Sequence, residues 1–173
     1  MKRIALIYGS FSGVIIIGSA MLSASLAGDT HLAGLEWLGY LVMTVALSMV
    51  YMGVKRYRDN ELGGVIRFGT AFLMGLGITA IASVIYVLLW EIYLVLTDYA
   101  FIEQYTTSII AGLEADGVVG AALEAEVRNM EEMKATYADP LYRIPITFLE
   151  IFPVGLLVTI ISAVLLRHPK SRG

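Results

Sequence analysis

Two carboxylates stand where the sequence is otherwise almost uniformly apolar: Glu91 in the run 68–96 and Glu150 in the run 144–166. A carboxylate is costly inside a hydrocarbon layer, so such residues commonly mark an ion or proton pathway or a buried pairing. Two carboxylates held together in a poor dielectric raise each other's proton affinity, and one of them then keeps its proton. The pair therefore predicts a candidate intramembrane site for a shared proton or a bound cation.

A structural interpretation of the same two acids stays open. In it, each acid is protonated, pairs with Arg143 or a tyrosine hydroxyl, or extends to the outer interface of the membrane. The depth of the two acids makes the pair of interest, because antiparallel neighbouring helices would place both at a similar depth. Glu91 lies seven residues before Asp98, and Glu150 lies six residues after Ile144. At a rise of about 1.5 Å per residue, both acids lie about 9 to 10 Å inside the same outer boundary.

Several other kinds of chemistry find no support in the residues present. The chain has no cysteine, which excludes disulfides, thiolate catalysis, cysteine-ligated zinc and iron–sulfur clusters. His31 and His168 are isolated, and they fall on opposite sides of the predicted membrane. The GxSxG, HExxH, GxGxxG and Walker patterns are absent. We therefore expect no metal and no cofactor, and an enzyme is the least supported class.

The elements that hold Glu91 and Glu150 follow from composition. Of 173 residues, 58% are hydrophobic and 16% are charged, and the mean hydropathy is +0.76. A soluble domain has about 45 to 50% apolar and about 25% charged residues. The excess apolar surface is best buried in lipid, so the sequence indicates an integral membrane protein.

Four apolar runs, 4–27, 35–54, 68–96 and 144–166, are long enough to cross a bilayer. A span needs about 20 residues as an α-helix, because backbone groups in lipid must be satisfied within their own segment. The predicted fold is therefore an all-α, integral membrane four-helix transmembrane bundle. The predicted insertion 97–143 between the third and fourth spans lies outside the membrane.

The direction of the spans follows from the basic residues, which are retained on the cytoplasmic side. Nine of the twelve lie before residue 4, in the loop 55–67 or in the tail 167–173, whereas the insertion 97–143 carries the other three and most of the acids. Both termini are therefore predicted to be cytoplasmic in a multi-pass protein. As an alternative, the basic start and the apolar run 4–27 resemble a cleavable signal peptide. The run is, however, longer than the apolar region of such peptides.

The insertion 97–143 is too long for a featureless loop and is predicted to be helical. One apolar stripe precedes the break at Asp116 and Gly117, and a second follows it. Three uses stay open for these stripes: packing on each other as a cap over the bundle, lying flat in the outer interface, or docking a partner. The stripes are Ile102, Tyr105, Ile109 and Leu113, then Val119, Leu123, Val127, Met130 and Tyr137.

Two features of the spans concern their shape and packing. Pro153, with Gly155 close after it, predicts a kink in the last span, either fixed or acting as a hinge.

Small residues allow helices to approach closely, within one bundle or in a dimer. The predicted packing faces are Gly9 and Gly13 in the first span and Ala71, Gly75 and Thr79 in the third.

The loop 55–67 carries Lys55, Arg56, Arg58 and Arg67 beside the membrane. Each basic residue there contributes about 1 kcal/mol of attraction to an anionic leaflet. The loop is predicted to anchor the topology, and it is a candidate site for a lipid head group or a partner.

Two segments are specific beyond their composition. Residues 53–64 read GVKRYRDNELGG, and residues 139–167 read DPLYRIPITFLEIFPVGLLVTIISAVLLR. Together they resemble DUF4199, a family of bacterial membrane proteins of unknown function, and the likeness in layout covers nearly the whole chain. The resemblance implies a bacterial inner (cytoplasmic) membrane protein with about four spans. It implies no activity and no residue roles.

These observations favour a structural or accessory subunit of a membrane assembly. A small transporter or channel component that uses Glu91 and Glu150 is the alternative, and a membrane enzyme is a distant third. The expected partners are the lipid bilayer and either another membrane protein or further copies of the chain. No nucleic-acid partner is expected.

Overall fold

The computed structural model describes residues 1–26 and 36–167, and this part of the chain is all-helical. The predicted outer turn 28–34 with His31, and the tail 168–173 with His168, lie outside the described residues. The six helices are α1 (Lys2–Leu26), α2 (Glu36–Glu61), α3 (Phe68–Leu96), α4 (Ala100–Ala115), α5 (Ala121–Tyr137) and α6 (Pro140–Leu166).

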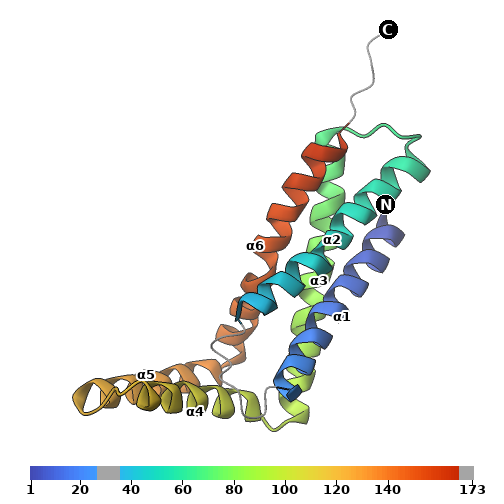
Figure 1. Ribbon diagram of the computed structural model, residues 1–173. Coiled ribbons are helices and arrows are strands. Elements are labelled where there is room, and N and C mark those ends of the chain that lie inside the picture. The colour runs from blue at the N-terminus through green and yellow to red at the C-terminus, as the bar shows by residue number, and fades with distance from the viewer. Residues whose placement is uncertain (27–35, 168–173) are drawn as a thin grey trace.

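The four long helices α1, α2, α3 and α6 lie side by side in an elongated bundle (Figure 1). Helix α3 is central, since it packs against α1, α2 and α6. The start of α1, the turn between α2 and α3, and the end of α6 all lie at one end of the bundle (Figure 1). That end is called the basic end below, because Lys2, Arg3, Lys55, Arg56, Arg58, Arg67 and Arg167 belong to these segments.

Within the described residues, three helices are long and apolar enough to cross a membrane. They are residues Lys2–Met21 of α1, all of α3, and all of α6. This finding indicates a membrane protein. Helix α2 is not among these three; it begins with an apolar part and continues into a charged stretch that ends at Glu61.

Helix α1 approaches α3 closely at two glycines. A Cβ atom placed on Gly9 would lie 2.7 Å from the Ile81 side chain, and one on Gly13 would lie 2.7 Å from the Ala82 carbonyl oxygen. Both distances are too short for any side chain, so only glycine permits this crossing. The two glycines are therefore used inside the chain, in the packing of α1 on α3.

Helices α3 and α6 interlock through reciprocal glycine and threonine pairs. A Cβ on Gly75 would lie 2.8 Å from the Thr159 methyl group, and a Cβ on Gly155 would collide with the Thr79 methyl group. The Thr79 hydroxyl lies 3.0 Å from the Thr159 hydroxyl and donates to the Gly155 carbonyl at 3.2 Å. Gly75 and Thr79 of the predicted face are thus buried in this contact, and Ala71, its third residue, is also buried.

Helix α6 remains one continuous α-helix through Pro145 and Pro153. Each proline lacks an N–H group, so Pro153 leaves the Leu149 carbonyl without its helical donor. Helices in membranes tolerate this loss when neighbouring groups compensate. Pro153 itself is exposed, whereas Gly155 is buried against Thr79.

Helices α4 and α5 pack on each other as a hairpin, called the arm below. The arm leaves the end of the bundle opposite the basic end and projects sideways, well beyond the outline of the four long helices (Figure 1). The two arm helices contact each other, but the arm does not cover the end of the bundle as a cap, which was one of the three uses left open for its apolar stripes (Figure 1). The corner between α3 and α4 turns the arm away from the bundle axis instead.

Candidate functional site

The strongest polar arrangement in the described residues joins Glu91 of α3 to Arg143 of α6. The Arg143 guanidinium donates from Nε to Glu91 Oε1 at 2.8 Å and from Nη2 to Glu91 Oε2 at 2.7 Å. The Arg143 side chain is 1% exposed and that of Glu91 is 23% exposed. Such a two-pronged pair is among the strongest polar contacts that proteins make, and its planar geometry fixes both side chains.

The start of α6 places Arg143 at this position. Asp139 caps the helix, accepting a hydrogen bond from the Leu141 N–H at 2.9 Å, and Pro140 occupies the first turn, where no donor is lost. Arg143 follows one turn later. Its Nη1 donates to the carbonyls of Tyr137 at 2.9 Å and Ala138 at 3.4 Å, where α5 ends. A cation is favoured at this negative end of a helix dipole.

Aromatic side chains surround the guanidinium. The Arg143 Cζ atom lies 5.3 Å from the Tyr99 ring centre and 5.6 Å from the Tyr137 ring centre, within the range of cation–π attraction. Trp90 of α3 donates from Nε1 to the Tyr137 hydroxyl at 2.8 Å. We call Arg143, Glu91, Tyr99, Tyr137 and Trp90 the Arg143 cluster. It ties α3, the α3–α4 corner, α5 and α6 together at one point.

The corner that turns the chain from α3 into α4 has an unusual backbone. Asp98 and Tyr99 have φ values of 48° and 59°, in the left-handed region that non-glycine residues seldom adopt. The Tyr99 N–H donates to the Leu94 carbonyl at 2.8 Å, which closes the end of α3. Phe101 then meets Trp90 edge-on at 4.8 Å between ring centres. The corner therefore holds Tyr99 over Arg143 and the arm against α3.

The Tyr137 hydroxyl is the titratable group of the cluster that lies on the arm. Burial raises the pKa of Tyr137 above its usual value, and the hydrogen bond from Trp90 opposes this effect. The charges of Glu150 and Glu91 raise the pKa further, while that of Arg143 lowers it. Tyr137 therefore stays protonated over the physiological range, which keeps its ring and hydroxyl neutral beside the guanidinium.

The structure does not bring Glu150 into the same ion pair. Arg143 satisfies both oxygens of Glu91, whereas the Glu150 side chain is exposed on α6. Glu150 still lies close enough to influence Tyr137 electrostatically. The structural interpretation of Glu91, in which it pairs with Arg143, thus matches the geometry, and the two acids have different surroundings.

The basic residues predicted to lie in a loop are mostly helical. Helix α2 continues to Glu61, so Lys55, Arg56 and Arg58 lie in its last turns, and only Arg67 belongs to the short connection. Arg58 donates from Nε to Asp59 at 2.6 Å, and this hydrogen bond lowers the pKa of Asp59. Gly63 and Gly64 have φ values of 64° and 85° and make the turn into α3.

Sequence reasoning named Arg143 only as one of several partners for the acids, and it did not connect Trp90, Tyr99 and Tyr137 to it. The available signal was the position of Arg143, an arginine directly before an apolar run and three residues after a proline. In the part of the chain that the structure describes, no three histidine or acidic residues come together as metal ligands.

The long apolar helices and their close crossings indicate the class of a helical membrane protein. Residues 5–168 match the family described as "Protein of unknown function (DUF4199)". Because the match covers nearly the whole chain, the protein belongs to this family, as the resemblance implied. No curated protein is similar to the chain. No solved structure is similar to it either.

Proposed function

We propose that the chain is a four-span protein of the bacterial cytoplasmic membrane and serves as a structural or accessory subunit of a membrane assembly. The arm α4–α5 would be its docking element on the outer face. The observation that carries this proposal is the sideways projection of the arm from a bundle to which the Arg143 cluster fixes it.

The proposal takes α2 as the fourth span. Residues 37–54 contain no charged residue. Along this run Leu47, Val50 and Val54 are buried, while Leu41, Val45 and Met52 are exposed on the other side of the helix. A helix that is apolar on both its inner and outer faces is suited to lipid rather than to water. The charged residues that follow reach the membrane surface at the basic end.

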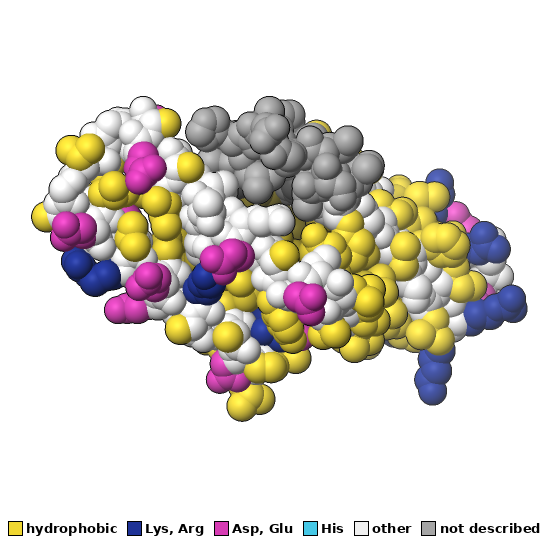
Figure 2. Space-filling model, turned by 90° about the horizontal axis from the view of Figure 1, so that it is seen from below, with side chains coloured by type: hydrophobic (Ala, Val, Ile, Leu, Met, Phe, Trp, Pro, Cys, Tyr) yellow, Lys and Arg dark blue, Asp and Glu magenta, His cyan; other side chains and the backbone are white. Residues whose placement is uncertain are grey.

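The distribution of charge supports the orientation. Figure 2 shows one group of lysine and arginine side chains at the far end of the bundle, and it shows most of the acidic side chains, with some basic ones among them, on and near the arm. Under the positive-inside rule the basic end is cytoplasmic. Both termini then lie in the cytoplasm, and the arm lies on the outer side of the membrane. The four antiparallel helices cross the membrane between these two sides.

The arm has the properties of a firmly held docking element. Lys134 of α5 forms an ion pair with Glu103 of α4, and the two helices are in contact along the arm. Glu124, Glu131 and Glu132 are exposed on α5, and Val119 at the tip is 74% exposed. We infer a partner that presents a basic or polar surface along the outer face of the membrane.

Transport through the two glutamates is less favoured. A shared proton or a bound cation needs two carboxylates that face each other and are free to titrate. The Arg143 guanidinium occupies both oxygens of Glu91, and Glu150 is exposed. Replacing both acids by glutamine tests this alternative. A loss of proton or cation flux in reconstituted vesicles would restore it, whereas unchanged flux would remove it.

The docking role is tested by placing a photo-crosslinking residue at Glu131 on the arm, with a matched control at Leu88. Leu88 is 54% exposed on α3 and faces lipid in the proposed arrangement. In native membranes we expect one discrete adduct with a different protein from position 131 and only lipid adducts from position 88. Two differently tagged copies of the chain distinguish the alternatives. Adducts formed only between the two copies, or no protein adduct at position 131, would contradict the accessory role.

A further inference from the structure

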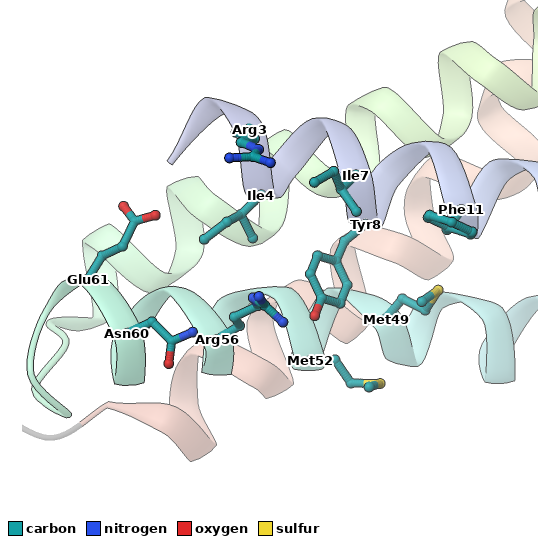
Figure 3. A pocket seen from close by; sticks show the side chains of 10 residues that line it. All are labelled: Arg3, Ile4, Ile7, Tyr8, Phe11, Met49, Met52, Arg56, Asn60 and Glu61. Atoms are coloured by element: carbon teal, nitrogen blue, oxygen red, sulfur yellow. The ribbon is translucent and has the colours of Figure 1, made fainter.

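A second site lies at the basic end, in a groove between the first turns of α1 and the last turns of α2. Its volume is about 530 Å³, within the usual range of ligand pockets. Figure 3 shows side chains from the two helices facing each other across it. Arg3, Asn60 and Glu61 lie toward the helix ends, and Phe11 and Met49 lie furthest from them (Figure 3).

The groove changes from polar to apolar along its length. Arg3 and Phe11 are separated by eight residues of α1, or about 12 Å at 1.5 Å per residue. Over this distance the lining changes from guanidinium and amide groups to hydrocarbon. The apolar part is open, since Ile7 is 44%, Phe11 60% and Met52 51% exposed. In a membrane, that part faces acyl chains and the polar part reaches the head-group layer.

The polar part carries net positive charge. Arg3 and Arg56 are both exposed and form no ion pair with another described residue. The acid in the groove, Glu61, accepts from the Met1 ammonium group at 3.2 Å, so its charge is already matched. Two guanidinium groups beside an apolar channel fit a phosphate that is attached to a hydrocarbon tail.

We propose that this groove binds one anionic phospholipid, with the phosphate between Arg3 and Arg56 and an acyl chain along Ile7, Phe11 and Met52. The charge selects an anionic lipid over a zwitterionic one, because the groove offers two cations and no unmatched acid. The apolar wall selects a lipid over a free phosphate. This site depends on the four-span placement proposed above but not on the docking role of the arm.

Native mass spectrometry of the purified full chain, titrated with phosphatidylglycerol or phosphatidylcholine, tests the site. Each arginine is expected to contribute a factor of about five to affinity, since a basic residue near an anionic surface is worth about that much. The variant R3Q/R56Q should therefore bind phosphatidylglycerol about 25-fold more weakly than the wild type. Phosphatidylcholine should bind to both proteins with similar, weaker affinity.

The matched control is K55Q/R67Q, which removes two charges from the same end of the bundle but outside the groove. It should change phosphatidylglycerol affinity by less than about twofold, since neither side chain lines the site. F11A should weaken binding by removing part of the apolar wall. Thermal unfolding of every variant is measured to confirm that it folds.

Three results would overturn the site. Equal losses of phosphatidylglycerol affinity in R3Q/R56Q and K55Q/R67Q would show a general attraction of the lipid to the basic end. Equal affinity of the wild type for the two lipids would show that charge does not select between them. Full competition by inorganic phosphate, with F11A unchanged, would show a phosphate site without a lipid. None of these results bears on the arm, and failure of the crosslinking at Glu131 would leave the lipid measurements intact. An inverted topology would instead contradict both proposals.

Discussion

At the scale of single residues, the structure makes a buried guanidinium stable where α6 begins, next to the arm. Burying an unpaired charge costs much free energy, and a buried ion pair is stable only when its remaining donors are also hydrogen-bonded. Arg143 meets this condition with two bonds to Glu91, two to carbonyls at the end of α5, and two aromatic rings. Its role is therefore to position the arm.

The first prediction concerns the coupling between Glu91 and Arg143. R143M leaves Glu91 without its cation and is expected to lower the free energy of unfolding by about 3 to 5 kcal/mol. A double-mutant cycle of E91Q and R143M should give a coupling energy of about 1 to 3 kcal/mol, because the two groups are in direct contact. Unfolding in detergent, followed by circular dichroism, measures both quantities.

The Lys134–Glu103 pair is the control for this cycle, since it links the two arm helices at the surface. Exposed pairs are worth less than about 1 kcal/mol, so E103Q and K134Q should each have small effects. A coupling at Glu91–Arg143 no larger than the coupling at this exposed pair would contradict the positioning role.

The second prediction follows from the raised pKa of Tyr137. The unfolded chain loses the phenol proton near pH about 10, whereas the folded chain keeps it to higher pH. This contribution to stability is therefore complete below about pH 10 and is lost as the pH rises through the folded pKa. Stability of the wild type and Y137F should be compared from neutral to alkaline pH. The wild type should lose more stability than Y137F above about pH 10; equal slopes would show that burial of Tyr137 has no such effect.

At the scale of helices, hydrophobic runs and small residues were informative because they report on properties local to one helix. The runs predicted where long helices occur, and Gly9, Gly13, Gly75 and Thr79 predicted close crossings that the structure contains. The choice between packing within the chain and packing in a dimer was not available from sequence. It depends on which helices are neighbours.

The candidate site was less predictable for the same reason. Sequence gives the depth of Glu91 and Glu150 along their helices but not the direction in which each helix is rotated. The two acids have similar predicted depth, yet one is enclosed by Arg143 and the other is exposed. The corner at Asp98 and Tyr99 was also hidden, because neither residue type signals a positive φ as clearly as glycine does.

The third prediction compares two glycines of α1 that differ only in what surrounds them. G9A would push a methyl group into Ile81 and the backbone of α3, and overpacking of this kind costs about 1 to 3 kcal/mol. G18A meets nothing within 4 Å, so it should be neutral or stabilising. Thermal unfolding in one detergent measures both variants. If G9A is as stable as G18A, α1 does not pack on α3 in the way described.

At the scale of the whole molecule, three features agree on one arrangement. The apolar faces of the bundle are turned outward, most of the basic residues lie at one end, and the acidic arm lies at the other (Figures 1 and 2). A bilayer accounts for all three, because it covers the apolar surface and separates the two charged ends. Both proposals depend on this placement, since the groove needs the inner leaflet and the arm needs the outer face.

Cysteine labelling in living cells tests this placement most directly, because the chain has no cysteine of its own. Single variants E131C on the arm and L62C in the turn after α2 each place one thiol at an exposed position. A membrane-impermeant maleimide should label E131C in cells with a permeabilised outer envelope and an intact cytoplasmic membrane. It should label L62C only after that membrane is disrupted. Labelling of L62C in intact cells, or protection of E131C, would contradict the four-span arrangement with an external arm.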